Sequence, residues 1–438
     1  MFFFFRSLFK QSNGYPIVFI PGLFGSIGSD IIPGAGKFRF GPADYVYRPI
    51  IEDLNKLGYR LDENLFIAFY DWRKENAYSA QKYLIPVIKK AKEKTKKEKV
   101  NIICHSMGGI VARAYIQSDY YENDVDKLVM IATPNSGSAN AYYFWEGGEL
   151  PYKEYNESLF YKILWEGFIW ILKFIHKEKD NLSLLHNYFP SIKDLLPSNE
   201  YGDYLFIENN DRFVRFIPIS QISSQNEFLN TLNKNIYEMY QKGIKIYLIT
   251  GTGKQTRKYL CVEKVPKSIK WFDGKPKYAV YTIRGDGTVT EDSVYTVYGD
   301  RYKIKSDHVE ILKECGGILS SILNVRRARR TMRARHKKMV NVYSIIASNV
   351  EKISISNNRG CNVMFNDRYI RAGELYVEKL GQDLYWIIMD NDRLKNLTVN
   401  IKTKKDKQTK VMVLKGDENR IVKKVDEAVN KESFILKI

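Results

Sequence analysis

The sequence predicts an α/β fold built on a parallel sheet, followed by a small domain made mostly of β-strands. Three observations support this prediction. Short runs of consecutive apolar residues alternate with helix-like stretches in the first part of the chain, a pattern typical of a parallel sheet buried on both faces. The alternation is interrupted between about residues 138 and 212. After about residue 340 only short segments of strand type follow.

Each element of the predicted sheet is a run rich in β-branched and aromatic residues. The predicted strands are Tyr15–Ile20, Leu65–Tyr70, Val100–Cys104, Lys127–Ala132 and Ile244–Ile249. The predicted helices are Ala43–Leu57, Ala80–Lys96, Gly109–Gln117 and Glu227–Lys242. A further helix is expected over Val309–Leu323, and short strands at Leu375–Val377, Leu384–Met389 and Leu397–Ile401. The order of these elements predicts strand–helix–strand units joined into one sheet.

A length of 438 residues suits two domains. We expect a catalytic domain over residues 12–325, with an aromatic-rich cap inserted at about 138–212. A basic linker over 326–339 then leads to a small β-rich accessory domain over 340–438.

Composition and charge restrict the class of protein. Hydrophobic residues make up 44% and charged residues 27%, as in ordinary globular proteins. The formal net charge of +19 favours anionic surfaces, either phospholipid or nucleic acid. The four cysteines show no paired spacing, so we expect reduced thiols and neither a zinc site nor a disulfide framework. The first ten residues lack the order of a secretory signal, and we therefore expect a cytoplasmic location with peripheral membrane contact.

The most informative short motif is Cys-His-Ser-Met-Gly-Gly at residues 104–109. A serine nucleophile of the α/β-hydrolase type stands on a tight turn between a buried strand and a helix, which requires small residues two positions before and after it. Ser106 has that context, except that Cys104 is larger than the usual glycine. Ser106 is the predicted nucleophile.

Acyl transfer also needs two backbone N–H groups that stabilise the oxyanion. One belongs to the residue after the nucleophile, Met107, and the other to a loop after an earlier strand. The segment Pro21–Ser26 directly follows the first predicted strand, which makes Leu23 the second candidate. An ordinary Gly-Pro turn is the alternative interpretation of this segment.

The general base must be a histidine that follows the nucleophile in sequence. The five histidines are His105, His176, His186, His308 and His336. His105 neighbours the nucleophile and should point away, two others lie in the predicted cap and His336 lies in a basic run. His308, just before a helix, is the remaining candidate.

The acid should lie between the nucleophile and the base in sequence. Asp286 occurs in Arg-Gly-Asp-Gly-Thr-Val, 22 residues before His308 and after a predicted strand over Tyr278–Ile283. A carboxylate there would hold the imidazole in one tautomer. Asp292, Asp300 and Asp307 are the alternatives.

Several separated motifs now resemble the lecithin:cholesterol acyltransferase family, which includes lysosomal-type phospholipases A and phospholipid:diacylglycerol acyltransferases. The motifs are IPGLFGS at residues 20–26, FYDWR at 69–73, CHSMGG at 104–109, ATPNSGS at 132–138, YFPSIKDLLPS at 188–198, GTG at 251–253 and GDGTV at 285–289. They cover roughly residues 15–325. The resemblance implies an α/β-hydrolase fold, the triad Ser106, Asp286 and His308, and oxyanion donors at Leu23 and Met107.

The resemblance also implies a lipid ester as substrate and no cofactor. Asp71 and Trp72 would form part of the wall near the acyl site, although a buried Asp-Arg pair beside a packed tryptophan explains them equally well. We add Phe24, Trp165 and Trp170 as candidate substrate-binding residues. No metal site is expected.

Two segments are candidates for membrane contact. Residues 158–175 are rich in Trp and Phe and suit an interfacial helix or lid, or else a buried cap helix. Residues 326–338 carry eight Arg or Lys. This basic run suits an anionic lipid surface or a solvated linker, and it suits nucleic acid less because no recognition motif accompanies it.

The sequence thus predicts a serine-dependent lipid acyl hydrolase or O-acyltransferase of phospholipase A or acyltransferase type. A carboxylesterase or GPI-inositol-deacylase-like hydrolase is the alternative within enzymes. A non-catalytic lipid-binding module is the alternative outside them.

Overall fold

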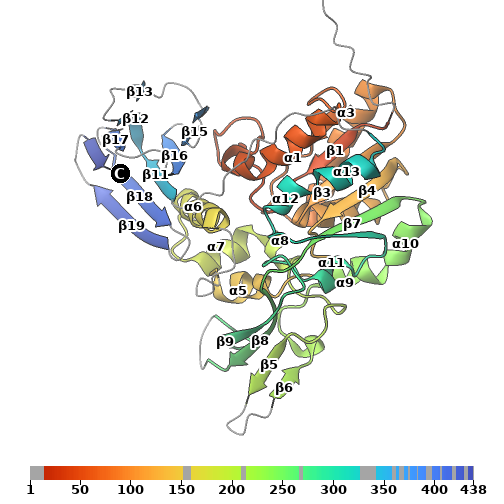
Figure 1. Cartoon of the computed structure of the whole chain (residues 1–438). Coiled ribbons are helices and arrows are strands. Elements are labelled where there is room, and N and C mark those ends of the chain that lie inside the picture. Colours follow the sequence, from red (N-terminus) through yellow and green to blue (C-terminus); the bar gives the residue numbers. More distant parts are fainter. Residues whose placement is uncertain are drawn as a thin grey trace, which may run out of the picture. The chain divides into compact units, whose positions relative to one another are not determined.

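Six parallel strands form the central sheet, in the order β10-β7-β4-β3-β1-β2 (Figure 1). In sequence order they are β1 Ile17–Ile20, β2 Leu65–Ile67, β3 Val100–His105, β4 Val125–Ile131, β7 Lys245–Gly251 and β10 Asp300–Ile304. All pairs within this sheet are parallel. Strands β1 and β3 are buried along their whole length. The predicted α/β fold class is confirmed.

The structure is a computed structural model of the chain. It describes residues 14–150, 159–208, 214–265 and 270–325, and in the C-terminal part 342–357, 362–364, 369–372, 375–381, 383–390, 397–404, 407–416, 421–428 and 433–437. Two compact units divide the chain. The first comprises Met1–Gly25, Asp44–Pro151 and Leu185–Arg333, and the second comprises Ser26–Ala43, Tyr152–Leu184 and Ala334–Ile438.

The helices of the first unit lie between the strands of the central sheet in sequence or follow the last of these strands. They are α1 Asp44–Lys56, α2 Asn76–Ser79, α3 Ile85–Thr95, α4 Met107–Ile116, α5 Asn140–Gly147, α8 Pro190–Lys193, α9 Glu227–Lys234, α10 Ile236–Gln241, α11 Glu291–Val294, α12 Ile311–Glu314 and α13 Gly316–Ile322. A π-helical turn, Ala80–Leu84, joins α2 to α3. Helix α7, Asn181–Tyr188, spans the boundary between the units. The predicted helix over 227–242 is interrupted at Asn235, and the one over 309–323 at Cys315.

A second sheet of the first unit has the order β6-β5-β8-β9. Its strands are β5 Leu205–Glu208, β6 Val214–Ile217, β8 Thr256–Glu263 and β9 Lys275–Thr282. The strand predicted before Asp286 therefore exists as β9, but it pairs antiparallel with β8 and does not join the central sheet. Backbone pairing of Lys254 with Asp286 brings the loop after β9 to the end of β7.

The C-terminal part of the second unit consists of strands, as predicted for the accessory domain. One sheet has the order β14-β15-β16-β11-β18-β19 and the other β13-β12-β17-β20. The strands are β11 Val342–Ser348, β12 Val350–Asn357, β13 Asn362–Met364, β14 Tyr369–Ala372, β15 Leu375–Leu380, β16 Leu384–Asp390, β17 Leu397–Thr403, β18 Thr409–Gly416, β19 Ile421–Ala428 and β20 Ser433–Lys437. Side chains from both sheets, such as Ile387 and Ile401, share one apolar core, so the sheets form a sandwich.

The aromatic helix of the predicted cap packs on this sandwich. Helix α6, Leu159–His176, contacts β11 and β18, and Figure 1 shows it beside these strands. The rings of Phe168 and Trp386 lie 5.1 Å apart in a T-shaped arrangement. A Cβ added to Gly167 would lie 2.2 Å from Cζ2 of Trp386, so only glycine allows this approach.

The cap was expected over residues 138–212. Of these residues, the described segment 159–184 clusters with the C-terminal strands, and the described residues on either side of it belong to the first unit. Most of the described apolar residues of α6, Phe168 and Ile171 among them, are buried, whereas Phe174 is 38% exposed. The alternative of a buried helix therefore agrees with the structure.

A third segment, Ser26–Ala43, also belongs to the second unit. Its Arg39 forms an ion pair with Glu378 of β15, whose side chain is fully buried. Truncation of one partner of such a pair leaves the other charge buried and unpaired. This ion pair therefore links the segment Ser26–Ala43 to the C-terminal strands.

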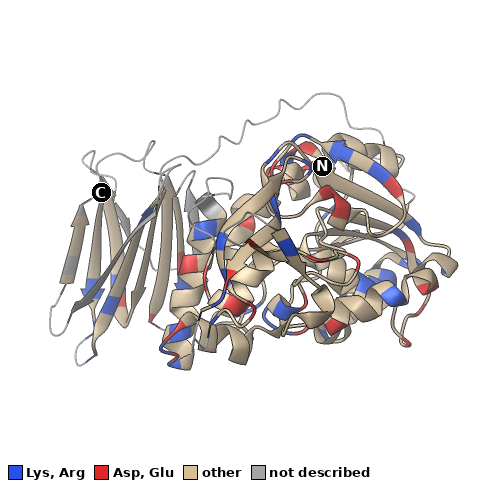
Figure 2. Cartoon of the chain, turned by 90° about the horizontal axis from the view of Figure 1, so that it is seen from below, with Lys and Arg blue, Asp and Glu red and all other residues tan. Residues whose placement is uncertain are grey.

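Basic and acidic residues are spread over helices and strands of both units (Figure 2). None of the helices in the described residues combines the length and the apolar character needed to cross a bilayer. The predicted basic run 326–338 and the first ten residues lie outside the described residues.

Candidate active site

Ser106 occupies a strained turn between β3 and α4. Its backbone has φ 54° and ψ −130°, a conformation that L-residues rarely adopt. The N–H of Ser106 donates to the backbone oxygen of Ile131 at 2.9 Å, which anchors the turn to the neighbouring strand β4. This is the strand–turn–helix geometry that exposes a nucleophile at the carboxyl edge of a parallel sheet.

Two glycines after Ser106 make the turn possible. A Cβ on Gly108 would lie 2.5 Å from the backbone oxygen of Ile20, and one on Gly109 would lie 2.1 Å from Oγ1 of Thr133. Helix α4 can approach β1 and the loop after β4 only because these side chains are absent. The larger residue before the serine, Cys104, is accommodated with its thiol fully buried, and burial raises the pKa of that thiol.

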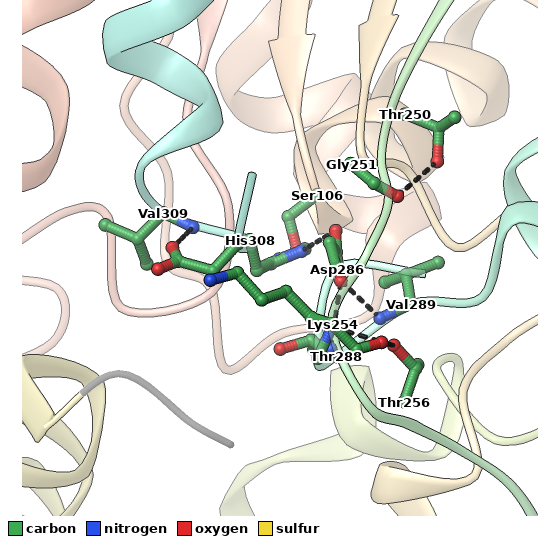
Figure 3. A network of polar contacts seen from close by, with 12 residues as sticks. Ser106, Thr250, Gly251, Lys254, Thr256, Asp286, Thr288, Val289, His308 and Val309 are labelled. Atoms are coloured by element: carbon green, nitrogen blue, oxygen red, sulfur yellow. Dashed lines mark hydrogen bonds and ion pairs between the residues drawn. The ribbon is translucent and has the colours of Figure 1, made fainter. Parts of the chain in front are cut away.

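The structure brings Ser106, His308 and Asp286 together from three distant parts of the chain (Figure 3). The Ser106 hydroxyl lies 3.0 Å from Nε2 of His308. On the other side of the imidazole, Nδ1 lies 2.7 Å from Oδ2 of Asp286. Both are hydrogen-bond distances. The three side chains follow one another in the order of a nucleophile, a base and an orienting carboxylate.

Backbone groups hold Asp286 in place. Its Oδ1 accepts hydrogen bonds from the N–H groups of Thr288 at 2.9 Å and Val289 at 2.7 Å, which leaves Oδ2 for His308. A Cβ on Gly251, at the end of β7, would lie 2.6 Å from Cβ of Asp286. The carboxylate is therefore packed directly against the central sheet although it follows a strand of the smaller one.

The alternative carboxylates have other partners. Asp292 pairs with Lys258 and Arg284 at the surface. Asp307 accepts from the N–H groups of Val309 and Glu310, at the start of the helical segment that contains α12. Asp300 lies at the beginning of β10, the end of the strand away from His308. Of the four candidate carboxylates, Asp286 is the one that contacts the imidazole of His308.

Leu23 and Met107 have the positions expected of oxyanion donors. Met107 is the first residue of α4, and the loop of Leu23 touches the nucleophile, because a Cβ on Gly22 would lie 2.9 Å from Cβ of Ser106. Within the described residues neither the Leu23 N–H nor the Met107 N–H donates to a protein oxygen. Neither N–H group is therefore committed to a protein acceptor in this part of the chain, as the predicted role requires.

His105, set aside at the level of sequence, links the two loops of the site. Its Nε2 lies 2.9 Å from the backbone oxygen of His308, and its Nδ1 lies 3.2 Å from the Tyr47 hydroxyl. That hydroxyl accepts from the N–H of Gly22 at 2.8 Å. Burial, together with the proximity of His308, lowers the pKa of His105 to about 3, so its ring is neutral.

The directions of these hydrogen bonds are all determined. A carbonyl oxygen only accepts, so Nε2 of His105 carries the proton and donates to His308, while Nδ1 accepts from Tyr47. Tyr47 in turn accepts from Gly22. The residue type at position 105 gave no sign of this role, because the partners Tyr47 and Gly22 lie far away in sequence.

Phe24 belongs to an aromatic stack. Its ring lies 4.7 Å from that of Trp72 in a T-shaped arrangement, and Trp72 lies 5.5 Å from Phe189. All three side chains are fully buried. The stack thus joins the loop after β1 to the segments FYDWR and YFPSIKDLLPS.

Asp71 forms a two-point ion pair with Arg73. Nε and Nη2 of Arg73 lie 2.9 and 2.8 Å from the two carboxylate oxygens. The Ser191 hydroxyl donates to the backbone oxygen of Trp72 at 2.7 Å, and Asp194 accepts from Asn76. These contacts account for Asp71 and Trp72 by packing and pairing, without a ligand.

Trp165 and Trp170 lie on α6, which belongs to the second unit, whereas Ser106, Asp286 and His308 belong to the first unit. Trp165 is completely buried, and Trp170 stacks on Phe174. The structure therefore does not bring these two candidate substrate residues together with Ser106 within one unit.

Comparison with known proteins confirms the resemblance found in the motifs. The family model described as lecithin:cholesterol acyltransferase matches residues 37–152, a range that contains Ser106 and the segment FYDWR. The match supports an enzyme that hydrolyses or transfers lipid acyl groups. No curated protein matches the chain.

Solved structures similar to the chain include lipases at low identity. The mature form of the Bacillus licheniformis lipase BlEst2 is 16% identical, with 73% of this chain and 96% of that chain covered and a TM-score of 0.37. Its propeptide form is 14% identical, with 98% of each chain covered and a TM-score of 0.37. The product of lin2722 from Listeria innocua is 10% identical, with 74% of this chain and 97% of that chain covered and a TM-score of 0.35.

Proposed function

We propose that this chain, which matches the lecithin:cholesterol acyltransferase family model over residues 37–152, is a serine-dependent lipid acyl hydrolase or O-acyltransferase. The observation that carries the proposal is the continuous series of contacts from Ser106 through His308 to Asp286. A ligand-binding module would not need a nucleophile in a strained turn beside a base.

In the first half of the reaction, Nε2 of His308 takes the proton of Ser106 while the serine oxygen attacks the ester carbonyl. The carbonyl oxygen becomes an oxyanion, which accepts from the N–H groups of Leu23 and Met107. His308 then gives its proton to the oxygen of the departing alcohol, and an acyl-serine remains. Asp286 stabilises the imidazolium that exists between these proton transfers.

In the second half, an acceptor resolves the acyl-serine. Water yields a free fatty acid, and an alcohol yields a new ester, with His308 acting first as base and then as acid. Which acceptor is used depends on how well the site excludes water. The full buried stack of Phe24, Trp72 and Phe189 supports a dry wall next to the oxyanion loop.

Peripheral contact with an anionic membrane surface, from a cytoplasmic location, is part of this proposal. The net charge of +19 supports it. The three described cysteines, which are free and buried, are compatible with a reducing compartment.

The test is product analysis by mass spectrometry after incubation with mixed phospholipids and alcohol acceptors. Wild type should release fatty acid or form new esters, and Ser106→Ala should do neither. Ser118→Ala, which changes a serine two residues after the end of α4, should behave as wild type. A fluorophosphonate probe should label wild type and Ser118→Ala but not Ser106→Ala.

The products also separate the alternatives. Free fatty acid alone would reject the transferase. Preference for short acyl chains would favour a carboxylesterase, and the absence of any new lysolipid, ester or fatty acid would reject the lipid enzyme.

A further inference from the structure

The small sheet β6-β5-β8-β9 is attached to the edge of the central sheet that carries the triad. Strand β8 begins two residues after Lys254, whose backbone pairs with Asp286, and β9 ends four residues before Asp286. The Thr256 hydroxyl accepts from the N–H of Gly287 at 2.8 Å. The antiparallel pair of β8 and β9 therefore starts beside the acid of the triad, and Figure 1 shows the four strands extending away from the central sheet.

One face of the small sheet is buried. Leu205 and Leu260 are direct neighbours on β5 and β8, and neither side chain is exposed. Val262, two residues further along β8, is buried as well. Because side chains alternate between the two faces of a strand, the residues next to these positions point to the opposite face.

That opposite face carries a row of apolar side chains in contact with one another. Phe216 on β6 is the direct neighbour of Phe206 on β5. Phe206 is paired in turn with Cys261 on β8, and Cys261 with Tyr278 on β9. The ring of Phe206 lies 5.5 Å from that of Phe216 and 5.9 Å from that of Tyr278. The row thus crosses all four strands.

Neighbouring positions extend this row into a partly exposed patch. The Tyr259 ring lies 5.3 Å from the Phe216 ring, and Val280 is directly opposite Tyr259. Val214 is two residues before Phe216 and points to the same face. The exposed fraction lies between 39% and 46% for Val214, Phe216, Tyr278 and Val280. Together with Tyr259, these four side chains form the apolar patch.

The strands that carry the apolar patch are basic. They contain five basic residues and two carboxylates, namely Arg215, Arg257, Lys258, Lys275, Lys277, Glu208 and Glu263. Arg215 on the edge strand β6 is exposed, as are Lys275 and Lys277 on the other edge strand, β9. Among the described residues these three form no ion pair, whereas Glu208 accepts from the Tyr278 hydroxyl. The apolar patch therefore lies between two basic edges.

An anionic bilayer fits this combination better than a second copy of the chain does. Aromatic side chains insert at the boundary between headgroups and acyl chains, while Lys and Arg remain among the headgroups. Two copies joined through the patch would bring basic edges together, in a chain whose formal net charge is +19. The patch also consists of a few partly exposed side chains, whereas a stable protein interface buries about 800 Å² per partner.

We propose that the apolar patch and its basic edges dock the protein on anionic lipid bilayers. This inference rests on the membrane contact included in the proposed function and names the surface that makes it. Neither of the two segments considered from the sequence, 158–175 and 326–338, belongs to this sheet. Because the sheet starts beside Asp286, docking there keeps the triad edge close to the bilayer that contains the ester.

Flotation with vesicles tests the surface, in the Ser106→Ala background so that the lipid stays intact. Wild-type strands should bind vesicles of phosphatidylglycerol and bind vesicles of phosphatidylcholine much less. Phe216→Thr should weaken binding to phosphatidylglycerol about tenfold because an inserted ring is lost, and Lys277→Gln about fivefold because one charge is lost. Tyr298→Thr and Lys245→Gln, at exposed residues near the opposite edge of the central sheet, are the matched controls and should bind as before.

A soluble substrate separates docking from catalysis. With Ser106 restored, all four variants should turn over a monomeric short-chain ester like wild type, since the apolar patch is not part of the triad. Loss of vesicle binding with unchanged turnover of this ester would support the inference. Equal vesicle binding by Phe216→Thr and Tyr298→Thr would overturn it.

A gain of signal covers the case in which Phe216→Thr does not fold. Phe216→Trp keeps an aromatic ring on β6, and its added fluorescence should be quenched by phosphatidylglycerol with brominated acyl chains. Tyr298→Trp is the control and should not respond, while the six native tryptophans contribute equally to both variants. Absence of quenching in vesicle-bound Phe216→Trp would overturn the inference, as would equal quenching of the two variants.

Two further outcomes assign the patch or the chain differently. A dimer seen by light scattering that Phe216→Thr dissociates, with unchanged vesicle binding, would assign the patch to self-association and overturn the inference. Vesicle binding through the patch without any Ser106-dependent turnover would instead count against the proposed function and leave the docking surface in place.

Discussion

The imidazole Nε2 of His105 lies 2.9 Å from the backbone oxygen of His308, so the residue before the nucleophile holds the loop of the base. Nδ1 of His105 accepts a hydrogen bond from the Tyr47 hydroxyl, and this hydroxyl accepts from the N–H of Gly22 in the oxyanion loop. The three parts of the candidate site are thus connected by neutral hydrogen bonds of fixed direction.

His105→Gln tests this connection. The amide N–H of glutamine can still donate to the backbone oxygen of His308, but the same amide group cannot also accept from the Tyr47 hydroxyl in the geometry of the imidazole ring. We expect kcat to fall about tenfold with KM little changed, since transition-state positioning and not binding is affected. Because the pKa of His105 is lowered to about 3, the acid limb of the pH–rate profile should keep its midpoint. A shift of that midpoint would contradict a positioning role.

Tyr47→Phe removes the acceptor of the Gly22 N–H and leaves a buried donor unpaired. The free energy of unfolding should decrease by about 1–3 kcal/mol, and kcat should fall because the oxyanion loop loses its anchor. Denaturant titration and steady-state kinetics measure the two effects. Tyr120→Phe, at a half-exposed tyrosine whose ring only stacks on Tyr115, is the matched control, and equal behaviour of the two variants would reject the anchor.

Asp286→Asn should abolish most of the activity without unfolding the loop. The amide oxygen can still accept from Thr288 and Val289, but the NH2 group would face Nδ1 of His308 and impose the wrong tautomer. In a serine protease the equivalent change lowers kcat about 10⁴-fold, and we expect a loss of that order. Asp292→Asn, which changes the alternative carboxylate at the surface, should retain activity. An inactive Asp292→Asn together with an active Asp286→Asn would identify Asp292 as the acid of the triad.

Gly167→Ala tests the packing of α6 on the C-terminal sandwich. The added methyl group would lie 2.2 Å from Cζ2 of the buried Trp386, so we expect the free energy of unfolding to fall by about 1–3 kcal/mol. Gly317→Ala, in helix α13 with no atom within 4 Å of the new Cβ, should be neutral or stabilise by about 0.5–1 kcal/mol. Thermal unfolding of the two variants checks this difference, and equal stability would show that α6 does not contact Trp386.

Asp194 should make stability depend on pH. Burial raises its pKa from 3.8 to about 6, although Asn76 donates to it. The folded state therefore binds the proton more tightly than the unfolded chain, so this contribution to stability is fully present below about pH 3.8 and is lost as pH rises through about 6. Over that window the unfolding free energy of wild type should fall by up to about 3 kcal/mol relative to Asp194→Asn.

Denaturant titrations between pH 4 and 7 measure the effect. Asp62→Asn, at an exposed carboxylate paired with Lys90, should keep the wild-type slope. A parallel pH profile for Asp194→Asn would show that the buried carboxyl does not titrate in this range.

Much of the fold of the first unit was determined by local sequence patterns. The runs around Ile17–Ile20 and Val100–His105 are apolar on both faces, and such segments have few alternatives to a buried parallel strand. The small residues after Ser106 permit one kind of turn, and the scarcity of histidines left His308 as the base. The motif pattern also predicted the resemblance to the family whose model matches residues 37–152.

Contacts between distant segments were decided only by the tertiary structure. An apolar helix such as α6 looks the same in sequence whether lipid, a lid or a sheet covers it, because hydrophobic periodicity reports burial and not the partner. The close contact between Gly167 and Trp386 identified the C-terminal sheet as the partner of α6. In the same way, sequence placed Asp286 after a strand, but the pairing of Lys254 with Asp286 decided that its loop reaches the central sheet. The sequence alone determined which groups could perform acyl chemistry. The fold decided which groups from distant parts of the chain hold them in position, because hydrogen bonds and packing depend on distance in space and not on separation in sequence.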